Sequence, residues 1–162
     1  MNEMLALLRV RQIMINRLAP VLILTALFAT AQPTQPRPLR ERLLESAQKG
    51  DADAQFELGK NYETGRIGLP KDLTQAQNWY HAAADQGDPY ALASLGILYN
   101  FGKGVQKDYV QAFMYYELAV ARSRGGNRDS IVELRDDLAK DMNAAQIAEA
   151  RRLAKIWKPT AQ

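Results

Sequence analysis

The stretch Ala54–Gly65, with the sequence AQFELGKNYETG, recurs 37 positions later as ALASLGILYNFG in Ala91–Gly102. Five residue types stand at the same places in both copies; in the first copy they are Ala54, Leu58, Gly59, Tyr62 and Gly65. The segment that follows each copy recurs as well, now 36 positions later. Its matching residues are Lys71-Asp72, Ala76, Trp79-Tyr80 and Ala83 in the first copy and Lys107-Asp108, Ala112, Tyr115-Tyr116 and Ala119 in the second. A fixed period of this length is typical of solenoids whose similar units stack on one another.

Each unit is predicted to form two helices. In the first unit, Asp51 is placed to accept hydrogen bonds from the free amides at the start of the first helix, and Gly65 is placed to end that helix. The sequence Asp72-x-x-Gln75 then predicts a capping box at the start of the second helix. The second unit repeats these signals with Asp88, Gly102 and Asp108-x-x-Gln111.

Glycine also stands in the middle of both first helices, at Gly59 and Gly96. A glycine inside a helix costs about 1 kcal/mol relative to alanine. Its use at the same position in both units therefore predicts that a partner helix passes too close for a β-carbon.

These residues resemble the Sel1-like repeat family, relatives of the tetratricopeptide repeats. The family pattern is carried by ADAQFELGKNY in Ala52–Tyr62, GKGV in Gly102–Val105 and AQNWY in Ala76–Tyr80. The resemblance extends over about Leu39–Trp157. It implies an all-α, right-handed solenoid of antiparallel helix pairs that binds other proteins, and it implies neither a catalytic site nor a cofactor.

The domain layout follows from the repeats. A half-unit, two full units, a degenerate capping unit and a tail are predicted at residues 39–50, 51–87, 88–124, 125–157 and 158–162. In the degenerate unit, Asn127 is the predicted N-cap and Arg135 replaces the repeated glycine. No Gly-x-Gly loop follows, and Asn143-x-x-Gln146 predicts another capping box. These losses fit a terminal unit without a further neighbour.

The N-terminus has the pattern of a secretory signal peptide at residues 1–31. Arginines precede an apolar run from Leu18 to Phe28, and the small residues Ala29 and Ala31 predict cleavage after Ala31. A proline-rich linker at residues 32–38 follows. The expected location is the periplasm of a bacterium or the outside of the cell. Two points stay open: whether translation starts at Met1 or Met14, and whether the signal is cleaved or kept as an anchor.

Charge and composition argue against several classes of function. Removing residues 1–31 deletes three arginines and one glutamate, and so lowers the formal net charge from +3 to +1. A nearly neutral mature chain removes the main support for nucleic-acid binding. The chain has no cysteine, which excludes disulfides, thiolate metal sites and a cysteine nucleophile.

The sequence offers little for catalysis, and we predict that the protein is not an enzyme. His81 is the only histidine and is predicted to be a solvated surface residue. Asp136, Asp137 and Asp141 have no histidine or cysteine to complete a metal site, so they are interpreted as a charged outer face. No metal or cofactor is expected.

The candidate partner-binding surface lies on the first helix of each unit, which lines the concave face in tetratricopeptide-like stacks. The candidate residues are Phe56, Lys60, Tyr90, Ala93, Ile97, Asn100 and Phe101. The predicted function is an exported, non-enzymatic adaptor or scaffold that binds a peptide or protein in this groove. Two alternatives stay open: a periplasmic enzyme acting on cell-wall or small-molecule substrates, and a membrane-tethered structural spacer. The partner's identity and the oligomeric state are not determined by the sequence.

Overall fold

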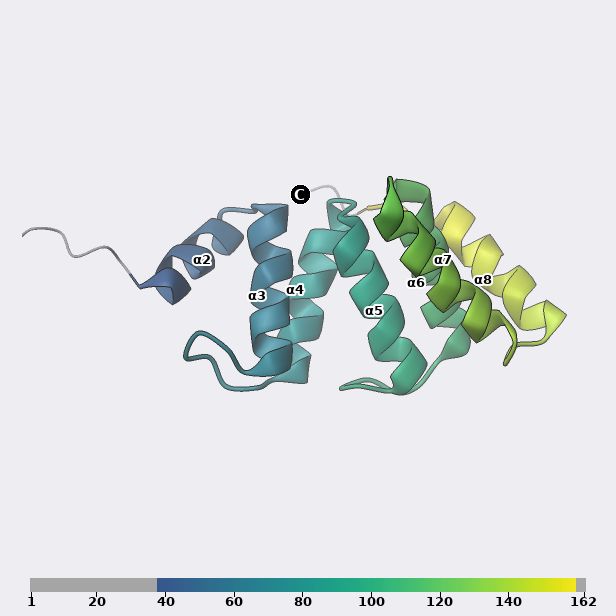
Figure 1. Cartoon of the computed structure of the whole chain (residues 1–162), viewed down its shortest axis with the longest axis horizontal. Coiled ribbons are helices and arrows are strands. Elements are labelled where there is room, and N and C mark those ends of the chain that lie inside the picture. The colour runs from purple at the N-terminus through teal and green to yellow at the C-terminus, as the bar shows by residue number, and fades with distance from the viewer. Residues whose placement is uncertain (1–37, 160–162) are drawn as a thin grey trace, which may run out of the picture. The chain divides into compact units, whose positions relative to one another are not determined.

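Seven α-helices follow one another along residues 38–159, which are the part of the chain that this computed structural model describes (Figure 1). They are α2 (Leu39–Gln48), α3 (Ala52–Thr64), α4 (Leu73–Asp85), α5 (Pro89–Phe101), α6 (Tyr109–Arg122), α7 (Gly126–Ala139) and α8 (Ala144–Ile156). The predicted all-α solenoid is confirmed for these residues, and none of these helices is long and apolar enough to cross a bilayer. The predicted signal peptide, the alternative start at Met14, linker residues 32–37 and tail residues 160–162 lie outside the described residues.

The two repeats form the helix pairs α3–α4 and α5–α6, each with its helices packed side by side. Asp51 caps α3, because its carboxylate accepts a hydrogen bond from the Ala54 amide at 3.0 Å. Gly65 ends the helix in the left-handed region at φ 72°. Asp88 and Gly102 play the same roles for α5. The predicted ends of both first helices are therefore confirmed.

The second helices begin differently from the prediction. Asp72 caps α4 with its carboxylate, which accepts from the Gln75 amide at 3.0 Å. The backbone N–H of Asp72, however, donates to the Tyr62 carbonyl at 2.9 Å, and that of Asp108 donates to the Tyr99 carbonyl at 3.0 Å. The predicted capping boxes are wrong in both repeats, because the amide that would complete each box is already bonded to the preceding helix.

The repeated glycines lie where the two helices of each pair meet. A β-carbon on Gly59 would stand 2.6 Å from the ring of Tyr80, and one on Gly96 would stand 2.5 Å from the ring of Tyr116. Both tyrosines are fully buried. The predicted close approach is confirmed, and the contact is a tyrosine ring of the second helix lying against the glycine of the first.

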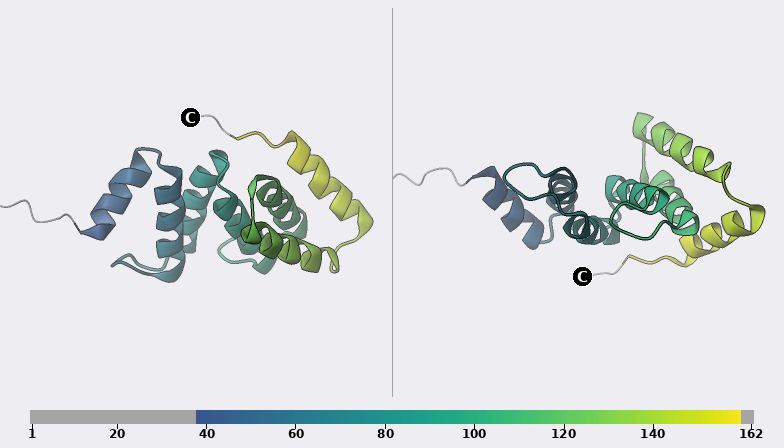
Figure 2. Two further views of the ribbon diagram at one scale, coloured as in Figure 1. Left: turned by 45° about the horizontal axis from the view of Figure 1, so that its top comes forward. Right: turned by 90° about the horizontal axis from the view of Figure 1, so that it is seen from below.

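The third unit does not reproduce this pairing. α7 and α8 each pack mainly against α6 and diverge from their connecting turn (Figure 2). Arg135 stands at the place of the repeated glycine, and Arg151 stands at the place of the repeated tyrosine. Both arginines pair with Glu117 of α6, at 3.8 Å and 3.4 Å. Two long side chains of like charge therefore replace the close glycine–tyrosine contact, and α6 supplies the carboxylate between them.

The ends of these last helices follow the prediction only in part. α7 begins at Gly126 after the N-cap Gly125, so Asn127 lies inside the helix and its prediction as N-cap is wrong. The positive φ of Gly125 turns the chain into α7 earlier than the repeat spacing suggests. At α8, Asn143 and Gln146 form the complete capping box that was predicted.

Glu117 should contribute measurably to holding the last two helices. Changing Glu117 to glutamine is expected to lower the free energy of unfolding by about 1 kcal/mol, because the two arginines lose a shared charged acceptor. Urea unfolding of the full chain measures this change. Glu149→Gln is the matched control, since the Glu149–Arg152 pair joins two exposed side chains within one helix. Equal losses in the two variants would contradict the role of Glu117.

Candidate functional site

A depression on the first helices brings several of the candidate residues together. Its lining consists of Asp53, Phe56, Glu57 and Lys60 of α3 with Tyr90 of α5, and its volume is about 410 Å³. We call this set the aromatic pocket. Three of its residues, Phe56, Lys60 and Tyr90, belong to the candidate surface, and the pocket spans the junction between the two repeats.

The rings of the aromatic pocket are held in place by their neighbours. The Phe56 and Tyr90 rings stack with centroids 5.6 Å apart, and Phe56 also lies 5.9 Å from the buried ring of Tyr80. The Tyr90 hydroxyl accepts a hydrogen bond from the side-chain amide of Asn127 in α7. Tyr90 nevertheless remains 45% exposed. The pocket therefore presents a fixed aromatic surface to solvent, which reduces the ordering cost of binding.

The charged residues of the pocket surround these rings. The Lys60 ammonium lies 5.3 Å from the Phe56 centroid and pairs with Glu57 at 2.8 Å. Such a pair contributes little to stability because both side chains are about half exposed. With Asp53 added, the pocket carries two carboxylates and one ammonium. Its rim is therefore slightly acidic.

The other candidate residues lie elsewhere along α5. Ala93 is buried and offers almost no surface, and Ile97 is half buried against the main core. Asn100 and Phe101 line a different depression, together with residues of α6 and α7 such as Tyr109. The structure thus divides the candidate surface between two places. The sequence analysis considered only the first helix of each unit and therefore did not include Tyr109, which begins a second helix. The absence of a Gly-x-Gly loop in the third unit was a signal that the surface around Tyr109 is open.

His81 does not occupy the solvated position that was predicted. It is half buried, and its ring meets the ring of Tyr115 edge-on with centroids 6.1 Å apart. Burial lowers the pKa of His81, and the nearby charge of Asp85 opposes that shift only in part. The prediction was wrong because it considered α4 alone, whereas α6 of the next repeat covers this face.

The lowered pKa of His81 makes stability depend on pH. The unfolded chain takes up the proton first as the pH falls below the ordinary pKa of 6.5, so the folded state loses stability there. We expect the urea midpoint of the wild type to fall more between pH 7.5 and pH 5 than that of His81→Gln. Carboxylates titrate in both proteins and cancel in the comparison. Parallel pH profiles would refute the link to His81.

The carboxylates at the end of α7 and in the turn after it are open to solvent, and two of them, Asp137 and Asp141, line the depression that contains Tyr109. Asp136 pairs with Arg135 at 2.7 Å, and Asp137 pairs with Lys140 at 2.6 Å. Asp136, Asp137 and Asp141 are exposed. Within residues 38–159, no group of histidine, cysteine and carboxylate side chains is arranged to hold a metal ion.

Comparison with known proteins identifies the repeats. The family model described as "Sel1 repeat" matches residues 52–88 and 89–123. A stretch of 58 residues is 41% identical to the "ERAD-associated E3 ubiquitin-protein ligase component HRD3A" of Arabidopsis thaliana. That match covers 36% of this chain and 9% of the relative.

One solved structure shows the same fold, and a second gives a weaker match. A protective antigen present in uropathogenic Escherichia coli strains, described as displaying an SLR fold, matches with a TM-score of 0.65 and 34% identity over 71% of this chain and 24% of its own. A Sel1 repeat protein from Oxalobacter formigenes matches with a TM-score of 0.47 and 28% identity over 72% of this chain and 97% of its own. The chain thus spans about a tenth of the length of the plant relative and about a quarter of the length of the antigen.

Proposed function

We propose, on the premise that this chain is a Sel1 repeat protein, that it is a non-enzymatic adaptor whose aromatic pocket binds a segment of a partner protein. Sel1 repeat proteins generally mediate protein–protein interactions. The Arabidopsis relative is described as a component of an E3 ubiquitin-protein ligase, and membership of an assembly supports an adaptor role.

The observation that carries this proposal is the partly exposed, fixed pair of rings formed by Phe56 and Tyr90. A buried aromatic pair needs no further explanation, but an exposed one rimmed by polar groups is typical of a protein-binding surface. The tilted contact of Phe56 with the Tyr80 ring and the hydrogen bond from Asn127 to Tyr90 hold the pair in position without a partner. The rings therefore offer an anchor point that binding does not have to order.

The chemistry of the pocket limits what it binds. The two rings favour an apolar or aromatic side chain as the anchor. Asp53 and Glu57 outnumber Lys60, so a basic residue beside that anchor is favoured over an acidic one. The partner segment is therefore an extended or helical peptide with an apolar anchor and a basic flank, lying along the first helices.

We further propose that the adaptor acts outside the cytoplasm of a bacterium. The support is the signal-peptide pattern of residues 1–31, with small residues at Ala29 and Ala31 after an apolar run. Intact mass of the exported protein tests this part. A product that begins at Gln32 supports export with cleavage, and a product that still carries Met1 or Met14 overturns the cleavage after Ala31.

Site-specific crosslinking tests the binding function. A photoreactive phenylalanine analogue at Glu57, on the rim of the aromatic pocket, is expected to crosslink a partner protein in the native host. The matched control carries the analogue at Thr74, an exposed position on a second helix. Crosslinking from position 57 and not from position 74 supports the pocket. Equal crosslinking from both positions, or from neither, would overturn it.

A further inference from the structure

The loop of the second repeat packs against the start of the second helix in the first repeat. Gly104 lies so close to Leu73, the first residue of α4, that a β-carbon on Gly104 would stand 2.6 Å from the Leu73 β-carbon. Gly104 also has φ +72°, which favours glycine. Beside it, the Lys103 ammonium reaches Glu63 at 4.0 Å. A glycine-tipped turn with a basic residue therefore covers the start of α4.

The equivalent place in the second repeat has no such cover. Tyr109 is the first residue of α6 and corresponds to Leu73. The third unit has no Gly-x-Gly loop, because α7 and α8 are joined by the short turn 140–143. An open depression of about 410 Å³ remains beside Tyr109. The missing loop thus leaves uncovered the surface beside Tyr109 that corresponds to the surface of Leu73 covered by Gly104. We call this uncovered surface the seat.

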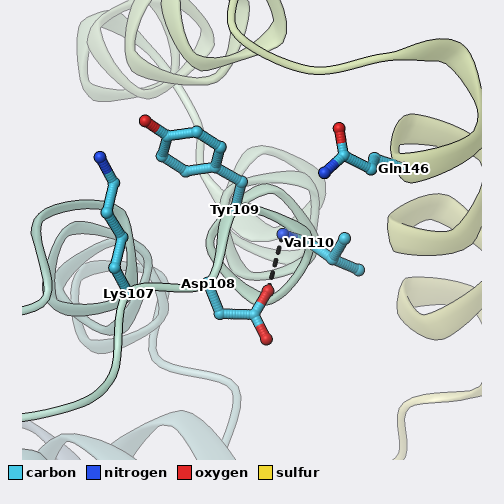
Figure 3. A pocket seen from close by; sticks show the side chains of 5 residues that line it. All are labelled: Lys107, Asp108, Tyr109, Val110 and Gln146. Atoms are coloured by element: carbon cyan, nitrogen blue, oxygen red, sulfur yellow. Dashed lines mark hydrogen bonds between the residues drawn. The ribbon is translucent and has the colours of Figure 1, made fainter.

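The lining of this seat is visible in Figure 3. The Tyr109 ring projects between the side chains of Lys107 and Gln146. The Lys107 ammonium lies 4.4 Å from the Tyr109 centroid. Gln146 accepts from the Asn143 backbone N–H through Oε1, and its Nε2 group makes no hydrogen bond with any described residue. The seat therefore combines an aromatic face with a free amide donor.

Carboxylates stand at the side of the seat that faces α7. A second depression of about 310 Å³ shares Lys107 and Tyr109 with the first, and it is lined by Asp137 and Asp141 as well. Asp137 pairs with Lys140 on its own helix. Among residues 38–159, Asp141 forms no ion pair within 4 Å, although Lys140 lies close enough to interact with its charge. An incoming basic side chain would find Asp141 here, whereas the residue of the second repeat that corresponds to Glu63 is the neutral Asn100.

We propose that this empty seat, formed by Lys107, Tyr109, Asp137, Asp141 and Gln146, binds a glycine-tipped turn of a partner protein that carries a lysine or arginine beside the glycine. The glycine packs on Tyr109 as Gly104 packs on Leu73, and the basic residue meets Asp141. The site lies at the end of the two repeats and is separate from the aromatic pocket. Its occupant is the kind of turn that a further repeat would have supplied.

The probe for this site is a peptide with the sequence of residues 101–107, FGKGVQK, closed into a turn by a flanking cysteine pair. It is titrated into the ¹⁵N-labelled full chain, and backbone amide shifts are recorded. We expect saturable shifts at residues 107–110 and 137–146, with a dissociation constant on the order of 1 mM for one short turn. Replacing the second glycine of the peptide with valine should weaken binding at least tenfold, because a β-carbon collides with the seat.

Protein variants test the charge component. Asp137→Asn combined with Asp141→Asn is expected to weaken peptide binding several-fold. Asp129→Asn combined with Glu133→Gln changes two exposed carboxylates of α7 that do not line the seat, and this pair should leave peptide binding unchanged. The proposal is overturned by absent shifts at residues 107–110, by equal binding of the valine peptide, or by shifts centred on the aromatic pocket. Shifts of the same amides on dilution of the protein alone would show that a second copy of this chain binds the seat. That result would also overturn the proposal.

Discussion

Gly96→Leu is expected to lower the free energy of unfolding by about 3 kcal/mol, the upper part of the usual range for overpacking a core. The β-carbon alone would stand 2.5 Å from the Tyr116 ring, and leucine adds three further carbons. Tyr116 is fully buried, so its ring cannot turn out into solvent without opening the core. The helices α5 and α6 must separate instead. Urea unfolding of the full chain, followed by circular dichroism, measures the loss.

Two comparisons isolate the cause of this loss. Gly126→Leu places the same residue at the start of α7, where nothing lies within 4 Å, and should change stability by less than about 0.5 kcal/mol. Gly96→Ala combined with Tyr116→Leu should destabilise less than the sum of the single changes, because the smaller side chain leaves room for a β-carbon. Equal losses of unfolding free energy in Gly96→Leu and Gly126→Leu would contradict a clash between Gly96 and Tyr116. Strict additivity of Gly96→Ala and Tyr116→Leu would contradict it as well.

The parts of the fold that the sequence predicts correctly depend on local chemistry or on repetition. Asp51 and Gly65 act within one or two turns of their own helix, so their roles follow from residue type and position. Gly59 and Gly96 were informative because the same costly residue occurs twice. Repetition thus revealed a tertiary contact, although it did not identify the tyrosine ring as the partner.

The parts that the sequence did not predict depend on contacts between distant segments. The capping box of Asp72 fails because a carbonyl of the preceding helix binds its amide. The helices α7 and α8 diverge, and Glu117 of α6 reaches an arginine on each of them. His81 is covered by a residue of the next repeat. None of these partners can be found from one helix considered alone.

The candidate surface shows the same limit. Spacing along α5 placed Tyr90 and Phe101 on one strip, but the structure puts them in different depressions. Residues from α3 complete the first depression, and residues from α6 and α7 complete the second. The positions of these residues on α5 follow from helical spacing, whereas their division between two depressions depends on how neighbouring units pack.

Tyr90→Ala is expected to weaken partner binding by about 2 kcal/mol or more, which corresponds to about 30-fold in the dissociation constant. Truncation removes one ring of the stacked pair and leaves Phe56 in contact with the Tyr80 ring alone. Folding should change little, because Tyr90 is 45% exposed and contributes one hydrogen bond with the exposed Asn127. Binding to the crosslinked partner, measured by calorimetry alongside the melting temperature, separates the two effects.

Two further variants decide what the Tyr90 ring contributes. Tyr90→Phe keeps the ring and loses only the hydroxyl that accepts from Asn127, so its affinity should stay within about threefold of the wild type. Phe101→Ala removes a more exposed aromatic outside the aromatic pocket and should leave affinity unchanged. A large loss in Tyr90→Phe would assign the effect to the link with α7 rather than to ring contact. A lowered melting temperature with unchanged affinity in Tyr90→Ala would show that the ring serves packing, and that the partner binds at another surface.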